Sequence, residues 1–506
     1  MPRSSGLLLH ISSLPGRHGI GDLGHDAFRF ADHLADTGQR IWQVLPLVPV
    51  GLGFSPYSSP STFAGNPLFI SPERLVEVGL LDGLAEPPAF PEGHVVFPAA
   101  IKYKEKLLTE AFGRFDDGAG DVDRSAYRQF CAENAYWLDD YALFMAMKRA
   151  FAGAPWTEWP APLSRRDVGA LEEFAVEHIR TIEQHRFQQF IFFLQWRDLK
   201  RYCNERSVSL FGDLPIYVAH DSADVWAHRD LFYLDEDGHC TVVSGVPPDY
   251  FSETGQRWGN PIYRWDRMRE NDYLWWMQRF AHTFGLVDLI RLDHFRAFAG
   301  YWEIPAQEKT AIHGRWVEGP GASLFRSIEE RIGPLPLVAE NLGLITPDVT
   351  ELMDTFGFPG MAVLQFAFHE TADHPFLPHN LQRNVVAYTG THDNDTIAGW
   401  WDHIRADPKQ ERTARFAREY VLGSSTDSSF HWAAIRAMMA SPANFVVIPA
   451  QDLLGLGSEA RMNTPGRGHD NWSWRLRWEQ LTPEILDRLK KLTAVYGRSD
   501  RLDDVL

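Results

Sequence analysis

The sequence predicts an α/β fold, a (β/α)8 barrel of the TIM class with large, mostly helical insertions and no C-terminal β-sandwich domain. Short apolar runs without strict alternation recur along the chain, and amphipathic helical segments separate several of them. Three of these runs deliver an acidic residue at or shortly after their end: Asp293, Glu340 and Asp393. Because the C-terminal ends of parallel barrel strands meet at one mouth, we expect these carboxylates to lie together there.

Eight segments have the composition of buried parallel strands, which is the number needed to close a barrel. The predicted strands are residues 7–11, 41–45, 209–213, 287–293, 337–340, 361–365, 385–388 and 445–449. Amphipathic helices are predicted at 27–37, after the first strand, and at 273–284, before the fourth. Alternation of strand and helix is typical of a parallel sheet.

The spacing between the strands predicts one catalytic barrel over residues 1–506 that three insertions interrupt. They are expected at about 47–185, mostly helical, at about 214–270, with a hairpin and a cleft loop, and at about 394–440, helical. Asp-Gly at 237–238 lies between two apolar runs and predicts the hairpin turn. After the last strand, Thr482 and Pro483 are typical of the start of a final helix.

Composition and charge limit the classes of partner. The chain has 49 basic and 67 acidic residues and a formal net charge of −18, which argues against nucleic acid and anionic membranes. Its three cysteines show no metal-ligand spacing and suit a reducing compartment. The apolar stretch at 7–11 is too short for a signal peptide, and no apolar segment approaches the ~20 residues of a membrane span. We therefore expect a cytoplasmic protein.

Two of the carboxylates are candidates for glycosidic bond cleavage, each with a structural alternative. Arg291 and Asp293 point to the same side of a strand, and a neighbouring cation keeps a nucleophilic carboxylate ionised. Glu340 would need burial or a nearby carboxylate to hold a proton as general acid. The structural alternatives are a salt bridge at the end of the barrel for Arg291–Asp293 and a helix cap for Glu340. A pair of carboxylates at one mouth is the equipment of glycosidases.

Two motifs allow other interpretations. His392 and Asp393 lie in a loop rich in hydrogen-bonding side chains, which suits sugar hydroxyls, although His and Asp also ligate metals. No second spaced histidine supports a metal site. Residues 19–24 (GIGDLG) match the glycine pattern of a dinucleotide-binding turn, but seven residues separate them from the first strand and the second strand ends in Leu45-Pro46 rather than an acidic residue.

Four segments together resemble the 4-α-glucanotransferases of the amylomaltase type, glycoside hydrolase family 77 of the α-amylase clan. They are 212–219 (GDLPIYVA), 291–296 (RLDHFR), 339–343 (AENLG) and 391–394 (THDN). Segments 55–59, 245–261 and 455–466 resemble loops around the family's cleft. The resemblance runs from residue 3 to 475 and is weakest at 73–205. Two departures are Asn341, where Asp is more common, and Ala297, where many α-amylases carry His; the second favours the transferase branch.

The resemblance implies transfer of α-1,4-glucan segments by a retaining double displacement, without a cofactor or a metal. It implies Asp293 as nucleophile, Glu340 as acid and base, and Asp393 as the third carboxylate. The implied substrate-binding residues are Tyr57, Asp213, Tyr250, Phe251, Gln256, Trp258, Arg291, His294, Phe366, His392 and Asn463.

Among these residues, Trp258 and Tyr57 are expected to stack on sugar rings. Asp293 and Glu340 are expected about 5–5.5 Å apart, the separation of retaining enzymes. The implied partners are maltooligosaccharides and α-1,4-glucans, with neither nucleic acid nor membrane, for a monomer or a weak homodimer. Two alternatives of function stay open on the sequence alone: an intracellular α-glucan hydrolase on the same site, and a glucan-binding protein without activity. A nicotinamide oxidoreductase is a more remote third.

Overall fold

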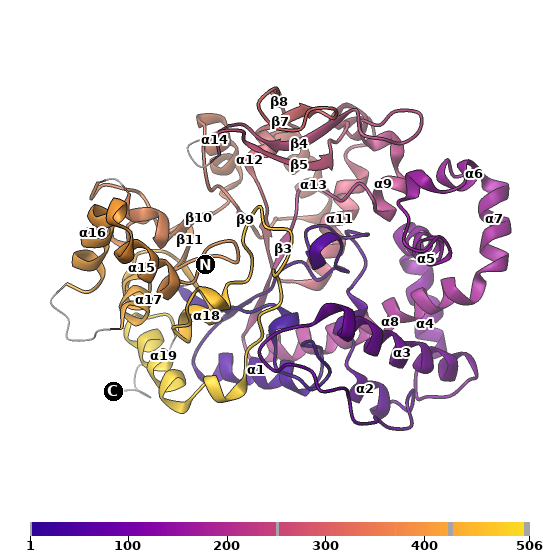
Figure 1. Cartoon of the computed structure of the whole chain (residues 1–506), viewed down its shortest axis with the longest axis horizontal. Coiled ribbons are helices and arrows are strands. Elements are labelled where there is room, and N and C mark those ends of the chain that lie inside the picture. Colours follow the sequence, from indigo (N-terminus) through magenta and orange to yellow (C-terminus); the bar gives the residue numbers. More distant parts are fainter. Residues whose placement is uncertain (1–2, 249–251, 370, 424–428, 500–506) are drawn as a thin grey trace.

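Eight parallel strands form the barrel at the centre of the molecule, seen in a computed structural model that describes residues 3–248, 252–369, 371–423 and 429–499 (Figure 1). Around the barrel their order is β10-β11-β12-β1-β2-β3-β6-β9. The strands are β1 (Ser4–Leu8), β2 (Ile41–Gln43), β3 (Ser209–Leu214), β6 (Leu289–Leu292), β9 (Leu337–Ala339), β10 (Gly360–Val363), β11 (Val385–Tyr388) and β12 (Phe445–Pro449). The predicted fold class is confirmed.

Side chains closest to the barrel axis form one apolar cluster. Each of the eight strands contributes at least one of its members: Leu8, Ile41, Phe211, Leu289, Val338, Met361, Val363, Val386, Tyr388, Phe445 and Val447. Branched and aromatic side chains fill the barrel in this way and leave its C-terminal mouth as the place for polar groups.

The seam between β9 and β10 closes through two hydrogen bonds outside the strand ladders. Ala339 N donates to Pro359 O at 2.8 Å, and Met361 N donates to Oδ1 of Asn341 at 2.8 Å. Asn341 therefore helps to close the barrel directly beside Glu340, a role that an aspartate oxygen could also fill.

The first strand begins and ends three residues earlier than predicted, at Ser4 and Leu8 instead of residues 7 and 11. Gly6 lies in the part that was missed, and a Cβ at this position would come 2.1 Å from the Ile41 carbonyl oxygen on β2. Close contact between the two strands thus selects a residue without a side chain, which an apolar pattern does not reveal. Ile11–Ser13, at the end of the predicted strand, forms a 3-10 turn instead.

Helices surround the barrel and fill the long connections. Between β2 and β3 lie α2 (Pro72–Glu77), α3 (Phe97–Asp116), α4 (Arg124–Glu133), α5 (Ala135–Ala150), α6 (Ala161–Ser164), α7 (Val168–Glu177) and α8 (Ile179–Glu205). Between β11 and β12 lie α15 (Ile397–Ala406), α16 (Glu411–Val421) and α17 (Phe430–Ala440). The others are α1 (His25–Asp36), α9 (Ala223–Ala227), α10 (Trp265–Glu270), α11 (Leu274–Leu286), α12 (Arg296–Ala299), α13 (Ala322–Ile332), α14 (Pro347–Phe356), α18 (Ala450–Leu453) and α19 (Pro483–Val495).

A second, antiparallel sheet lies beside the barrel mouth and was not predicted. Its strand order is β5-β4-β7-β8, with β4 (Val242–Val246), β5 (Gln256–Pro261), β7 (Gly300–Pro305) and β8 (Arg315–Glu318). Figure 1 shows it at the top, next to α12 and α14. The predicted hairpin turn is present, since Gly238 N donates to Asp235 O and a single bridge joins Leu234 to Cys240. However, β4 pairs with β5 and β7 rather than with residues 232–234.

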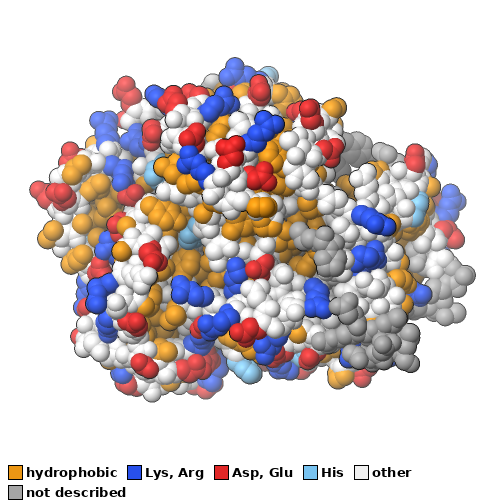
Figure 2. Space-filling view, turned by 180° about the vertical axis from the view of Figure 1, so that it is seen from behind, with side chains coloured by type: hydrophobic (Ala, Val, Ile, Leu, Met, Phe, Trp, Pro, Cys, Tyr) orange, Lys and Arg blue, Asp and Glu red, His pale blue; other side chains and the backbone are white. Residues whose placement is uncertain are grey.

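The surface mixes charges of both signs. On the face drawn in Figure 2, Lys and Arg lie among Asp and Glu, with hydrophobic side chains between them. Across the described ranges, none of the helices combines the length and the apolar character that a membrane span requires.

Candidate functional site

Polar side chains gather at the C-terminal ends of neighbouring barrel strands. Asp213 lies in β3 and Arg291 in β6, where the two residues are register partners. Asp293 directly follows β6, and Glu340 directly follows β9. Strand pairing therefore brings together residues that lie up to 127 positions apart in the sequence. This mouth of a parallel barrel is where catalytic groups lie in other enzymes of the fold.

Arg291 joins two of the carboxylates. Its Nη1 donates to both carboxylate oxygens of Asp213, at 2.9 and 2.7 Å, and its Nη2 lies 2.8 Å from Oδ1 of Asp293. The Arg291 and Asp213 side chains are buried, whereas the Asp293 side chain is 26% exposed. Burial acts to lower the pKa of Arg291, but Asp213 and Asp293 together raise it well above its usual value. The guanidinium therefore stays charged and fixes the Asp293 carboxylate.

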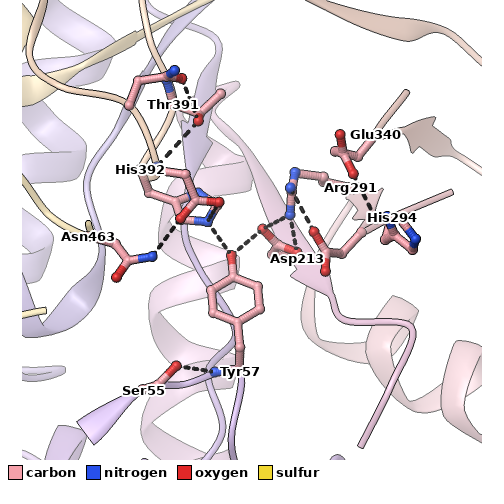
Figure 3. A network of polar contacts seen from close by, with 12 residues as sticks. Ser55, Tyr57, Asp213, Arg291, His294, Glu340, Thr391, His392 and Asn463 are labelled. Carbon is pink, nitrogen blue, oxygen red and sulfur yellow. Dashed lines mark hydrogen bonds and ion pairs between the residues drawn. The ribbon is translucent and has the colours of Figure 1, made fainter. Parts of the chain in front are cut away.

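Tyr57 links this network to the opposite side of the barrel mouth. Its hydroxyl donates to Oδ2 of Asp213 at 2.9 Å and lies 3.0 Å from Nε2 of His392, as Figure 3 shows. The Tyr57 ring also stacks on the His392 ring, with centroids 5.3 Å apart, and tilts against Trp472. Burial raises the pKa of Tyr57 and lowers that of His392, so both side chains act as neutral hydrogen-bonding groups near pH 7.

The environment of Glu340 differs from that of Asp293, because backbone N–H groups rather than an arginine contact its oxygens. Backbone N–H groups of His294 and Leu342 donate to its two carboxylate oxygens, at 2.9 and 2.8 Å. His294 adopts a left-handed conformation with φ of 47°, uncommon for a residue with a Cβ, in the turn that presents this N–H. Burial, with a further contribution from the Asp293 charge, raises the pKa of Glu340 to about 7. One carboxyl can thus hold a proton near neutrality beside a carboxylate that an arginine fixes.

The third carboxylate, Asp393, lies in the loop after β11. Asn463 Nδ2 donates to its Oδ1 at 2.7 Å, and its Oδ2 lies 3.4 Å from Nε2 of His392. The loop folds on itself because Asn394 Oδ1 accepts hydrogen bonds from both the backbone N–H and the hydroxyl of Thr391, each at 2.8 Å. The Asp393 side chain is 44% exposed, so it is open to a ligand from the solvent side.

An aromatic group borders the carboxylates on the side of the second sheet. Trp258 is 40% exposed, lies edge-to-face against His294 with ring centroids 4.7 Å apart, and donates through Nε1 to Gln256 Oε1 at 3.1 Å. Phe366 follows β10 and packs against the apolar cluster of the barrel interior. Tyr250 and Phe251, also predicted to bind substrate, lie outside the described residues.

The glycine pattern at residues 19–24 has a structural explanation in the packing of the chain. The glycines of residues 19–24 face neighbouring chain rather than open space: a Cβ at Gly21 would come 2.0 Å from the Ile11 carbonyl oxygen, and one at Gly24 would come 2.7 Å from the Ser71 hydroxyl. Protein therefore fills the place where a dinucleotide would approach the turn. Among the described residues, no group of three or more His, Cys, Asp or Glu side chains has the arrangement of a metal site.

Comparison with known proteins identifies the family. Residues 9–482 match the profile of the family described as 4-alpha-glucanotransferase, glycoside hydrolase family 77. The chain belongs to this family. The 4-alpha-glucanotransferase of Thermus thermophilus is 48% identical over 98% of this chain and 99% of its own length, and that of Synechocystis is 45% identical over 98% of both. The predictions of the family and of the enzyme class are confirmed.

Solved structures of the family agree with the fold. The amylomaltase from Streptococcus agalactiae in complex with acarbose is 36% identical, with a TM-score of 0.93 over 98% of this chain and 100% of its own. The amylomaltase from Corynebacterium glutamicum is 18% identical, with a TM-score of 0.78 over 97% of this chain and 75% of its own, and shows the shared fold.

Some residues around the site were not predicted. Arg461 Nη2 donates to the backbone carbonyl of Asp393 at 2.7 Å, and its Nε donates to that of Asn463, also at 2.7 Å. Asp452, 1% exposed, accepts hydrogen bonds from Thr389 Oγ1 and Ile397 N and so holds both ends of the loop that carries Asp393. Arg461 lies in the segment 455–466, which was recognised as family-like, but its role depends on contacts between distant segments.

Proposed function

We propose that the chain moves α-1,4-glucan segments from a donor glucan to the 4-OH of an acceptor glucan or glucose by a retaining double displacement. The observation that carries this proposal is the contrast between Asp293, whose Oδ1 lies 2.8 Å from Nη2 of Arg291, and Glu340, whose pKa of about 7 allows it to hold a proton. Family membership supports the assignment to transfer.

In the first half of the reaction, Asp293 attacks the anomeric carbon and forms a glycosyl ester, while Glu340 gives its proton to the leaving glycosidic oxygen. Arg291 aligns the attacking carboxylate through the contact between its Nη2 and Oδ1 of Asp293. The N–H groups of His294 and Leu342 fix both oxygens of Glu340, which orients the carboxyl before substrate arrives. The donor's reducing-end portion leaves with a free 4-OH.

In the second half, the carboxylate of Glu340 removes the proton from the 4-OH of an acceptor, and that oxygen attacks the anomeric carbon and releases Asp293. Two inversions give net retention, and the proton count returns to its start. The chemistry requires the chain's own side chains and no cofactor or metal. Whether a glucan or water arrives second depends on what the cleft holds next to the intermediate.

The groups opposite Glu340 are suited to holding the sugar. Asp393, fixed by Asn463 and near His392, presents an exposed oxygen to ring hydroxyls. We assign to the same subsite Tyr57 with its hydrogen-bond partners Asp213 and His392, and Trp258 with its partner Gln256. The acarbose in the Streptococcus agalactiae relative supports an oligosaccharide ligand here. We propose maltooligosaccharides and longer α-1,4-glucans as substrates.

The setting of the enzyme is part of the proposal. We place it in the cytoplasm as a monomer or weak homodimer, with the barrel and its insertions as one catalytic unit. Cys131, Cys203 and Cys240 are free thiols, which suits a reducing compartment.

Incubation with maltotriose alone, followed by chromatography and a reducing-end assay, tests the function. Transfer predicts glucose together with a ladder of longer maltooligosaccharides and a constant number of reducing ends. An α-glucan hydrolase on the same site would give maltose and glucose with a rising number of reducing ends. Unchanged maltotriose would indicate a binding protein without activity.

A further inference from the structure

Three side chains next to the acid/base loop form an exposed surface that the proposed mechanism does not use. Trp316 on β8 is 43% exposed, and Leu344, four residues after Glu340, is 70% exposed. Arg296, at the start of α12, lies between them. Its Cζ is 3.8 Å from the centre of the Trp316 ring, and its Nη1 lies 3.5 Å from the Leu344 carbonyl oxygen. We call Trp316, Arg296 and Leu344 the outer platform.

The packing of the second sheet holds the outer platform in place. Trp316 pairs across the strands with Trp302, with ring centroids 5.3 Å apart and an interplanar angle of 69°. Trp302 is fixed in turn, because its Nε1 donates to the Ala311 carbonyl at 2.9 Å. Its ring also covers Gly314, where a Cβ would come 2.2 Å from Nε1. Packing on Trp302 therefore fixes the exposed Trp316 ring, which reduces the conformational entropy lost when a ligand stacks on it.

The outer platform continues the candidate site on one side. Arg296 follows the nucleophile Asp293 by three residues, and its Nη2 donates at 3.3 Å to Thr346 Oγ1, at the end of the acid/base loop. Two residues before Arg296, His294 contacts Trp258. Two exposed tryptophans thus contact the short turn 294–296, Trp258 at His294 and Trp316 at Arg296. Glu340 protonates the leaving oxygen, so this is the side of the leaving and accepting glucan.

We propose that the outer platform binds glucose units of the leaving or accepting α-1,4-glucan that extend beyond the catalytic cleft. A pyranose ring combines a flat C–H face with a rim of hydroxyls, and an exposed tryptophan beside an arginine and a leucine offers matching apolar and hydrogen-bonding surfaces. This inference rests on the proposed function and adds a length preference to it: long acceptors gain a contact that short acceptors cannot reach.

The test measures transfer from maltotriose to acceptors labelled at the reducing end, from maltose up to maltooctaose, by wild type and Trp316→Ala. We expect the variant to raise the acceptor KM about two- to tenfold for the longest acceptors, the range for loss of one aromatic contact, and to change it less than about twofold for maltose. The acceptor length at which the loss begins gives the reach of the outer platform. Trp316→Phe should recover most of the lost affinity.

Trp478→Ala is the matched control. This tryptophan also carries a stacked arginine, with Arg29 Cζ 4.2 Å from its ring centre, but its contacts are with α1, where its Nε1 donates to Asp26 Oδ1 at 2.6 Å, and not with the carboxylates of the site. It should leave the ratio of long- to short-acceptor KM unchanged, whatever its effect on melting temperature.

An equal loss for acceptors of every length, or no loss for any, would overturn the assignment. A change of oligomeric state in light scattering, with unchanged acceptor dependence, would assign the surface to a protein contact and also overturn it. If wild type itself gives no transfer from maltotriose, the proposed function fails first, so the two failures are distinguishable.

Discussion

Replacing Arg291 with lysine should separate two roles of this residue: the alignment of the nucleophile Asp293 and the supply of a positive charge. One guanidinium now serves two carboxylates, with Nη1 on both oxygens of Asp213 and Nη2 on Asp293. A lysine ammonium keeps the positive charge but lacks the planar fork, so it cannot hold both groups in these positions. Because the Asp213 side chain is fully buried and that of Asp293 is 26% exposed, the ammonium should stay with Asp213 and release Asp293.

The size of the effect follows from the contact that is lost. A hydrogen bond to a charged group contributes about 1.5–3 kcal/mol, and the Arg291–Asp293 contact is too buried on the arginine side for strong solvent screening. If this energy serves the transition state, kcat should fall about 10- to 150-fold. KM should change little, since Asp293 acts on the anomeric carbon rather than on binding.

The assay is maltotriose disproportionation, with glucose release measured by a coupled enzyme. Arg279→Lys is the matched control: Arg279 is 1% exposed, but its guanidinium donates to Thr62 Oγ1 and to the carbonyls of Ile216 and Pro215 rather than to a carboxylate of the site. It should lower the melting temperature and leave kcat within about twofold of wild type. A kcat of Arg291→Lys equally close to wild type would refute the alignment argument.

The remaining predictions concern protonation and the cleft loops. Because the pKa of Glu340 is raised to about 7, this carboxyl is protonated below pH 7 and ionised above it, and kcat/KM should fall about tenfold per pH unit above pH 7. A kcat/KM that stays constant between pH 6 and 9 would exclude Glu340 as the acid. Burial likewise raises the pKa of Asp452 to about 7, so the folded state binds more protons than the unfolded state between about pH 4 and 7. As the pH rises through that window, the melting temperature of wild type should therefore fall relative to that of Asp452→Asn. A difference in melting temperature that stays constant with pH would show no such linkage. Trimming residues 245–255 should raise hydrolysis relative to transfer. An unchanged ratio of reducing ends to transfer products would show that this loop does not determine which acceptor reacts. Trp258→Ala should weaken substrate use at nearly constant melting temperature, because the ring is 40% exposed; the opposite result would make it a core residue.

The barrel was predictable from sequence because buried parallel strands have a distinct composition. Strands β11 and β12 match the predicted ranges, and most other strand ends differ by one or two residues. The start of β1 was missed because Ser4, Ser5 and Gly6 are small or polar, although all three are buried. The second sheet was missed because its strands β7 and β8 are joined by nine residues without a tight-turn signal.

The residues of the candidate site were predictable from the sequence, but the hydrogen bonds between them were not. The sequence identified Tyr57, Asp213 and His392 through resemblance to the family, yet the hydroxyl of Tyr57 between Asp213 and His392 joins segments that only the fold brings together. Arg461 contacts backbone carbonyls, which every residue carries, so no motif could point to its partners. The raised pKa of Glu340 depends on burial, which the sequence suggested only through its position after a strand.

Trapping of the covalent intermediate tests whether Asp293 is the nucleophile. Glu340→Gln, which cannot supply the acid or base, should be incubated with an α-maltotriosyl fluoride, whose leaving group needs no proton, and the enzyme then analysed by intact and peptide mass spectrometry. We expect an adduct of one maltotriosyl unit on the peptide that contains Asp293, and no adduct when Asp293→Asn is added. An adduct on another residue, or none while the fluoride is consumed, would contradict the double displacement at Asp293.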